Sequence, residues 1–228
     1  MHGVSGRQRF SPSSGSLNPT LARLNMPTLR HLLCTALAAV FSCGAIAPAD
    51  DAPPLVQPSL LSSCSGARSI VVDKSERTLE LHCDDRVAGR YDVSLGFTPA
   101  GHKHHEGDGR TPEGEYLITG KWHSRFHRTL QIGYPNVQDA RRGLAEKQIT
   151  RRQHDAIARA NRSCRLAPQN TPLGSYLQVH GGGGGKESGD WTLGCVALDN
   201  DWIEDVFAFH RPGCHADGSP RTPLRIVP

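Results

Sequence analysis

The chain has 228 residues, of which 37% are hydrophobic and 21% charged, and its formal net charge at pH 7 is +4. This length suits one domain with a proper core and is too short for two comfortable ones. Residues 1–49 hold four of the 26 basic residues and no acidic residue, so the remaining 22 basic residues balance the 22 acidic ones. The overall basicity is therefore no evidence for nucleic-acid binding.

The N-terminal residues 1–49 predict an export segment. Met26–His31 is basic, Leu32–Phe41 is a short apolar run, and Ala47–Ala49 has the small residues of a cleavage site. This is the layout of a secretory signal, and the apolar run is too short to span a bilayer stably. We therefore expect an exported protein of the periplasm or cell envelope.

Two further readings of the N-terminal segment stay open. Residues 1–25 are polar and have no structural period, so they are interpreted as an over-extended start upstream of Met26. Val40–Cys43 loosely matches a lipoprotein signal, although Phe41 fits it badly. Residues 50–66 contain three prolines and predict an extended linker, which leaves residues 67–228 as the one folded domain.

Short apolar or alternating runs separated by turn residues predict a mostly β protein. The predicted strands are Ile70–Asp73, Thr78–Cys83, Arg90–Leu95, Glu115–Thr119, Thr129–Gly133, Tyr176–His180, Gly194–Leu198 and Leu224–Val227. Their spacing favours an antiparallel-rich sheet. We expect an α+β fold, a β-sandwich or partly closed β-barrel decorated by helices.

Three helices are predicted from capping signals. Asn136 caps a helix that begins at Val137, and Thr150–Gln153 has the spacing of a capping box. These two helices form an insertion ahead of the last strands. The third helix, Trp202–Phe209, follows Asp199 or Asn200 as its cap and directs one face inward; the residues of that face are Ile203, Val206, Phe207 and His210.

Five of the seven cysteines lie after the export segment, and an odd number predicts disulfides plus one free reactive thiol. Cys195, beside a glycine, is the expected free thiol. The turn between the first two strands brings Cys83 back toward Cys64, so we predict Cys64–Cys83 and, from what remains, Cys164–Cys214. No Cys/His spacing matches a zinc site, and the chain is predicted to need no metal or organic cofactor.

One imidazole and one thiol are candidates for chemistry. His180 precedes Gly181, and Cys195 follows Gly194, each at the edge of an apolar run. A thiol attacks a carbonyl as thiolate, so it needs a base or an electropositive neighbour. Glycine lets the backbone approach a substrate, so Gly181 and Gly194 are predicted to expose N–H groups to an oxyanion, and the Cys195 N–H is predicted to donate to it as well. A buried cysteine near a core histidine is the alternative.

These motifs resemble the L,D-transpeptidase catalytic domain (YkuD-like) family over roughly residues 69–227. The matching segments are His180–Gly181, Thr192–Cys195, Asn200 and Gly109–Tyr116. Tyr134–Asn136 and Asp190–Thr192 resemble the murein L,D-transpeptidase subgroup. Many members have histidine and arginine where this chain has Leu193 and Ala197, so contacts made by that arginine are not implied here.

The resemblance implies an enzyme that crosslinks peptidoglycan stem peptides. Cys195 would form a thioester with a stem tetrapeptide, His180 would act as base, and an amine would accept the acyl group. Carbapenem-type β-lactams should acylate Cys195. A hydrolase with the same Cys/His pair and a non-catalytic wall-binding module remain alternatives, whereas a papain-like protease has the two residues in reverse order.

Several other residues are assigned by prediction. Thr192, Trp191, Tyr134 and Arg110 are candidate substrate-binding residues, and residues 181–185 are expected to form a mobile flap. The histidines of residues 102–105 fit a shaped turn better than a metal site. Residues 141–165 are strongly basic, as a solvated helix face or as a surface for an anionic polymer. We expect a monomer that binds peptidoglycan stem peptides. We expect it neither to bind nucleic acid nor to span a membrane.

Overall fold

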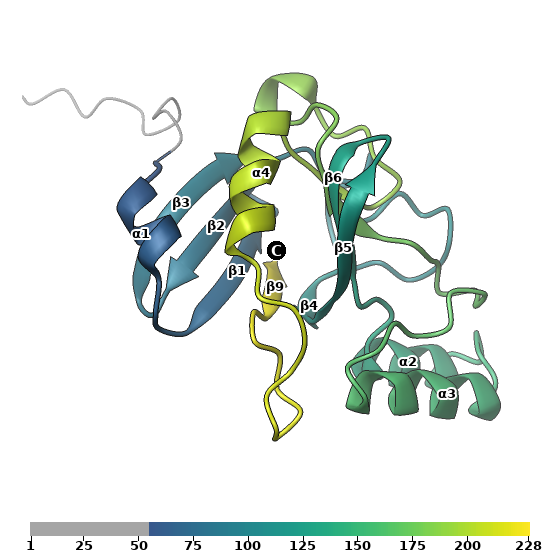
Figure 1. Cartoon of the computed structure of the whole chain (residues 1–228). Coiled ribbons are helices and arrows are strands. Elements are labelled where there is room, and N and C mark those ends of the chain that lie inside the picture. The colour runs from purple at the N-terminus through teal and green to yellow at the C-terminus, as the bar shows by residue number, and fades with distance from the viewer. Residues whose placement is uncertain (1–54) are drawn as a thin grey trace, which may run out of the picture. The chain divides into compact units, whose positions relative to one another are not determined.

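Two mixed β-sheets form the framework of the computed structural model, which describes residues 55–228 (Figure 1). The predicted export segment, residues 1–49, lies outside the described residues. The first sheet has the strand order β3-β2-β1-β9-β4. Its strands are β1 (Arg68–Asp73), β2 (Thr78–Cys83), β3 (Arg86–Asp92), β4 (Gly114–Tyr116) and β9 (Leu224–Val227). The predicted α+β class, mostly β with helical decoration, is confirmed.

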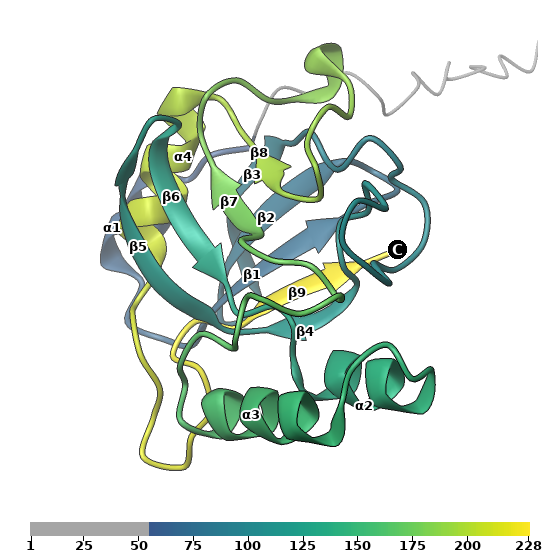
Figure 2. The same cartoon turned by 90° about the vertical axis from the view of Figure 1, so that its right-hand side faces the viewer.

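The second sheet carries the segments of interest and has the strand order β5-β6-β7-β8. Its strands are β5 (Ile118–Ser124), β6 (His127–Ile132), β7 (Gln178–His180) and β8 (Val196–Ala197). Strands β5 and β6 form an antiparallel hairpin, β6 pairs antiparallel with β7, and β7 pairs parallel with β8. In Figure 2 the short strands β7 and β8 lie beside the hairpin.

Strands β1 and β2 follow directly from the sequence pattern. Alternate residues of both strands are buried, and the pair runs in register from Arg68 opposite Cys83 to Asp73 opposite Thr78. Period-two alternation puts the apolar side chains on one face of the pleated sheet, where they join the core. The prediction of two strands around a tight turn is confirmed.

Two strand predictions differ from the structure. The predicted strand Arg90–Leu95 is displaced, since β3 ends at Asp92 and the following residues leave the first sheet. The predicted strand Glu115–Thr119 is two strands, β4 and β5, in different sheets. In the first case residues 90–95 alternate polar and apolar in sequence, although the chain leaves the sheet after Asp92. In the second case the burial pattern alternates through residues 115–119 while the chain crosses from one sheet to the other.

The predicted extended linker is wrong over Pro58–Ser63, which forms helix α1. Proline at the first position suits a helix start, because its missing N–H is not needed there. Leu60 and Leu61 of α1 pack against the core, so this segment belongs to the folded unit. Its burial of apolar side chains outweighs the bias of the flanking prolines toward extended chain.

The helical insertion is confirmed as α2 (Val137–Ala145) and α3 (Arg151–Arg162). Asn136 accepts hydrogen bonds from the backbone at the start of α2, and Thr150 and Gln153 form the predicted capping box of α3. Satisfying these otherwise unpaired N–H groups fixes where each helix begins. In Figure 1 the two helices lie together, away from α4.

Helix α4 (Asn200–Phe209) packs against β6 and is linked to the first sheet as well. Tyr91 Oη of β3 donates to Asp205 Oδ2 at 3.0 Å, and Arg68 of β1 donates to the carbonyl of Phe209 at 2.9 Å. The predicted inward face is corrected at one position, because Phe209 is buried and Phe207 is half-buried. Phe207 instead lies under the cationic groups of Lys121 and Arg128.

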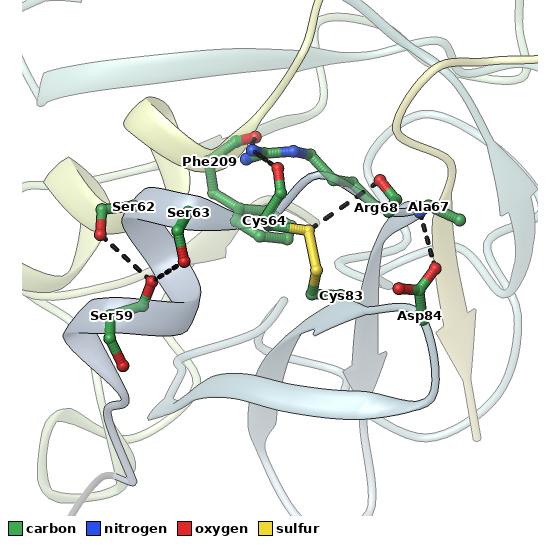
Figure 3. Close-up of a disulfide and its surroundings, with 10 residues drawn as sticks. Ser59, Ser62, Ser63, Cys64, Ala67, Arg68, Cys83, Asp84 and Phe209 are labelled. Carbon is green, nitrogen blue, oxygen red and sulfur yellow. Dashed lines mark hydrogen bonds between the residues drawn. A yellow bond between two sulfur atoms is a disulfide. The ribbon is translucent and has the colours of Figure 1, made fainter.

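Both predicted disulfides, Cys64–Cys83 and Cys164–Cys214, are present, and Cys195 is the free cysteine of the described residues. Figure 3 shows Cys64–Cys83 joining the end of α1 to the end of β2, with Arg68 donating to the carbonyl of Cys64. By restricting the unfolded chain, each crosslink contributes about 3–4 kcal/mol to the free energy of unfolding. None of the helices between residues 55 and 228 has the length and apolarity needed to cross a membrane.

His210 makes the fold sensitive to acid. Its side chain is 2% exposed, and neither ring nitrogen has a hydrogen-bond partner within residues 55–228. Burial, together with the charges of Lys121 and Arg211, lowers the pKa of His210 to about 4. In the unfolded chain a histidine has a pKa of about 6.5. Between this pH and about 4, the unfolded chain therefore binds a proton at His210 that the folded protein does not bind. The resulting stability is present above pH 6.5 and is lost as the pH falls toward 4.

We predict that His210→Leu reduces this acid sensitivity. Between pH 7 and pH 4.5, the wild-type free energy of unfolding should fall by about 2–3 kcal/mol more than that of the variant. Urea unfolding at the two pH values measures both quantities. An equal fall in the two proteins would show that His210 is not the group responsible.

Candidate active site

Cys195 lies in a tight turn that Thr192 closes. Thr192 Oγ1 accepts a hydrogen bond from the Gly194 N–H at 3.0 Å and donates to the carbonyl of Cys195 at 2.8 Å. Gly194 has a φ of +125°, and a Cβ there would come within 2.6 Å of the carbonyl oxygen of Arg110. Glycine is therefore required for both its conformation and its size. The turn presents Cys195 immediately before β8.

The strand-like residues after β3 hold this turn in place. Ser94 and Ala197 exchange backbone hydrogen bonds, and Thr192 donates to and accepts from the backbone of residues 95–97. Asp190 adds side-chain contacts, since it accepts from the Leu95 N–H at 2.9 Å and from the Arg77 guanidinium. The catalytic turn is thus fixed at both ends to the chain that leaves the first sheet.

His180 ends strand β7 and is 2% exposed. Its Nδ1 lies 2.6 Å from the carbonyl oxygen of Gly181, which can only accept, so Nδ1 carries the proton. The ring stacks on Phe126 with centroids 4.4 Å apart, and Trp191 approaches it edge-on at 6.0 Å. These contacts fix the imidazole and leave Nε2 unprotonated, as a general base requires.

His180 and Cys195 line the same cavity, whose volume is about 720 Å³. The parallel pairing of β7 with β8 sets Val179 opposite Val196 and His180 opposite Ala197, so Cys195 lies across from Gln178. Because alternate residues of a strand share a face, this register puts His180 and Cys195 on the same side of the sheet. Trp191, which is 44% exposed, and Thr192 also line the cavity. The cavity can hold a peptide segment at the thiol.

Burial disfavours the charged form of both His180 and Cys195. Burial raises the pKa of the Cys195 thiol above its ordinary value, although the Gln178 backbone N–H and the charge of Lys103 act in the opposite direction. Burial also lowers the pKa of His180, against the effect of its hydrogen bond to Gly181. Both shifts disfavour charge, so the site holds a thiol beside a neutral imidazole.

We predict that the alkylation rate of Cys195 by iodoacetamide rises about tenfold per pH unit between pH 6 and pH 8.5, with no plateau. The rate follows the thiolate fraction, which grows throughout this range when the thiol pKa is raised. Intact-mass spectrometry after timed quenching measures it, and the four disulfide-bonded cysteines stay silent. A plateau below pH 7 would instead reveal a thiolate–imidazolium pair.

Two of the predicted oxyanion donors, the N–H groups of Gly181 and Gly194, already have hydrogen-bond acceptors within the protein. The Gly194 N–H is bound to Thr192 Oγ1, and the Gly181 N–H donates to the carbonyl of Arg128 at 3.0 Å. Neither is free to stabilise an oxyanion. In the described part of the chain the Cys195 N–H has no hydrogen-bond acceptor, which makes it the candidate donor at this turn. Gly181 matters for space, because a Cβ there would lie 2.8 Å from Asn200 Oδ1.

Two predicted substrate contacts lie elsewhere. Tyr134 is fully buried and donates to the carbonyl of Leu173, so it belongs to the core. The Arg110 guanidinium is directed to the carbonyl of His102 and does not line the cavity. Residues 181–185 are also not a free flap, since Gly182 and Gly184 donate to Asn200 and Asp199 at the start of α4.

Sequence reasoning missed most of the residues that line the cavity, among them Lys103, Arg125 and Phe126. Arg125 and Phe126 occupy the tip of the β5–β6 hairpin, and their position beside His180 depends on β6 pairing with β7. The sequence offered one signal for Lys103. Asp108 follows it by five residues in the same glycine-rich loop, a spacing that lets the two side chains form an ion pair.

Seven of the eight basic side chains in residues 141–165 are exposed, most of them on α2 and α3. One member differs, because Arg142 is half-buried and donates to the carbonyl of Lys103 at 3.0 Å. The remaining side chains fit the interpretation as a solvated helix face. The attraction of this surface to an anionic polymer stays a prediction.

Comparison with known proteins identifies one family. The family model YkuD, L,D-transpeptidase catalytic domain, matches residues 67–223. The protein named "Putative L,D-transpeptidase YafK" of Escherichia coli strain K12 is 25% identical over 166 residues, which are 70% of this chain and 53% of that protein. The chain thus spans about half the length of the curated relatives that it matches.

Solved structures of two proteins are similar at low identity. The helical cell shape determining protein Pgp2 of Campylobacter jejuni has a TM-score of 0.41 and 17% identity, over 70% of this chain and 47% of that chain. An L,D-transpeptidase of Xylanimonas cellulosilytica has a TM-score of 0.37 and 14% identity, over 72% of this chain and 62% of that chain.

Proposed function

Because the chain belongs to the YkuD family of L,D-transpeptidase catalytic domains, we propose that it is a cysteine-dependent peptidoglycan L,D-transpeptidase. The observation that carries the proposal is one free thiol, Cys195, in the same cavity as His180, whose Nδ1 is bound to the Gly181 carbonyl. This arrangement leaves one imidazole nitrogen for proton transfer at the thiol.

The first half of the reaction forms a thioester. Cys195 Sγ attacks the carbonyl at the L-centre of diaminopimelate in a stem tetrapeptide, while His180 Nε2 takes the thiol proton. The C–N bond to the terminal D-alanine breaks as His180 returns the proton to the leaving amine. The Cys195 N–H donates to the oxyanion, an interaction of about 3 kcal/mol in comparable sites.

The second half transfers the acyl group. The side-chain amine of a second stem attacks the thioester, His180 takes its proton, and Cys195 leaves as thiolate and is reprotonated. Trp191 lies at the cavity wall, where it would contact the peptide, and Thr192 holds the turn. No metal or organic cofactor enters this chemistry. We further propose that the enzyme acts in the periplasm or cell envelope, where its substrate lies, and that carbapenems acylate Cys195.

Incubation of the purified protein with stem tetrapeptides, followed by mass spectrometry of the products, tests the proposal. Crosslinked dimers with release of D-alanine support a transpeptidase. Tripeptide without dimers identifies water as the acceptor and an L,D-carboxypeptidase with the same two residues. Binding without any product would favour a wall-binding module and overturn the enzyme.

A further inference from the structure

Lys103 is a buried cation in the catalytic cavity that the reaction above does not use. Its side chain is only 2% exposed, yet it lines the cavity together with His180 and Cys195. Its Nζ donates to Asp108 Oδ1 at 2.7 Å. Within residues 55–228 no second acceptor contacts Nζ, so two of the three ammonium N–H groups remain for a ligand.

Asp108 holds this cation and is itself saturated. Its two carboxylate oxygens also accept from the backbone N–H groups of His104, His105 and Arg110. Burial acts to raise the pKa of Asp108, but the bond from Lys103 and the three N–H groups lower it to about 2. The carboxylate therefore stays ionised and gives the buried Lys103 side chain a fixed ionic partner.

The surrounding backbone fixes where the ammonium lies. Arg142 of α2 donates to the carbonyl of Lys103, and the Glu106 N–H donates to the carbonyl of Pro172. A Cβ at Gly174 would come within 2.8 Å of Lys103 Cε, so glycine leaves room for the lysine stem. A preorganised cation with unused donors is suited to bind an anion tightly.

Lys103 is near the reacting sulfur without binding it. Its charge acts on Cys195, while no hydrogen bond joins the two side chains. The second cation of the cavity, Arg125, is exposed and lies over the Phe126 ring at 4.8 Å. Lys103 is therefore the desolvated cation of the two, and an ion pair in a buried site is worth more than one at an exposed rim.

We propose that Lys103, held by Asp108, binds the carboxylate that the substrate carries beside the scissile amide, which in a stem tetrapeptide is that of the terminal D-alanine. The proposal rests on the proposed function for the identity of the substrate. Lys103 thereby selects peptides that end in a free carboxylate one residue after the attacked carbonyl. It positions that carbonyl over Cys195 and leaves the proton transfers to His180.

A test that needs no turnover compares two alkylating reagents on Cys195. Iodoacetate carries a carboxylate and iodoacetamide does not, and both react with the thiolate, so any change in thiol pKa cancels in the ratio of their rates. Lys103→Met should lower the iodoacetate/iodoacetamide rate ratio about tenfold relative to wild type. Arg125→Gln is the matched control and should lower it less than twofold. An unchanged ratio in Lys103→Met, or an equal fall in the control, overturns the proposal.

A second test uses stem tetrapeptides that end in D-alanine or in its carboxamide. Lys103→Met should lower kcat/KM for the carboxylate substrate at least about tenfold more than for the carboxamide. Equal losses on both substrates would contradict carboxylate binding. If wild type turns over neither substrate, the proposed function is wrong. The ratio of the two alkylation rates then still shows whether Lys103 binds a carboxylate beside Cys195. Lys103→Gln, which can still donate to Asp108, replaces the methionine variant if that protein does not fold.

Discussion

Replacing Cys195 by alanine should abolish product formation, lowering kcat/KM by at least about 10⁴-fold. The reaction requires a covalent thioester, and no other described cysteine is free to form one. The fold should persist, because the contacts of the Cys195 thiol are weak: it lies 4.0 Å from the carbonyl of Tyr176 and near the backbone N–H of Gln178. Product analysis and urea unfolding measure the two quantities.

Cys195→Ser is the matched variant, since it keeps the shape of the side chain with a far weaker nucleophile. It should also be inactive, and neither variant should gain mass from a carbapenem, whereas wild type gains one equivalent. If residues 1–49 are an export segment, the same spectrum of wild-type protein recovered from the producing cells should show the mass of a shortened chain. Full activity of Cys195→Ala would end the thioester mechanism.

Replacing His180 by glutamine should lower kcat about 10³-fold, since the attacking thiol loses its base and the leaving amine its proton donor. The alkylation rate of Cys195 at pH 8.5 should change less than about threefold, because no imidazolium stabilises the thiolate in the resting protein. Turnover and alkylation together thus separate a general base from a preformed ion pair.

His154→Gln is the control for this substitution. His154 lies on α3, with Nδ1 beside Asp155, and does not line the cavity. It should keep wild-type turnover. A loss of alkylation in His180→Gln that matches its loss of turnover would mean that His180 acts by maintaining the thiolate.

The sequence predicted those parts of the fold whose signals are local. The caps at Asn136 and Thr150 lie at the starts of their helices because each side chain satisfies N–H groups within three residues. The alternation in β1 and β2 predicted their pairing, and hence the closeness of Cys64 to Cys83. Cys195 as the free thiol followed from the odd number of cysteines.

Features that depend on distant pairing were not predictable in the same way. Phe126 stacks on His180 only because β6 pairs with β7, about fifty residues along the chain. Tyr134 and Arg110 were assigned to the substrate from motif likeness, yet their surroundings in the fold place them in the core and in a supporting loop. Lys103 reaches the cavity through the loop held by Asp108, which no periodicity indicates.

The anchoring of the cysteine turn to residues 94–97 has a consequence for fluctuations of the native protein. The backbones of Thr192 and Ala197 both form hydrogen bonds with that segment. Gly182 and Gly184, which follow His180, donate instead to side chains at the start of α4. A subglobal opening that releases residues 94–97 would therefore disassemble nucleophile, turn and oxyanion donor together. Amide hydrogen exchange should show the N–H groups of Thr192 and Ala197 exchanging as one cooperative unit, and this unit would set how often an inactive conformer is visited.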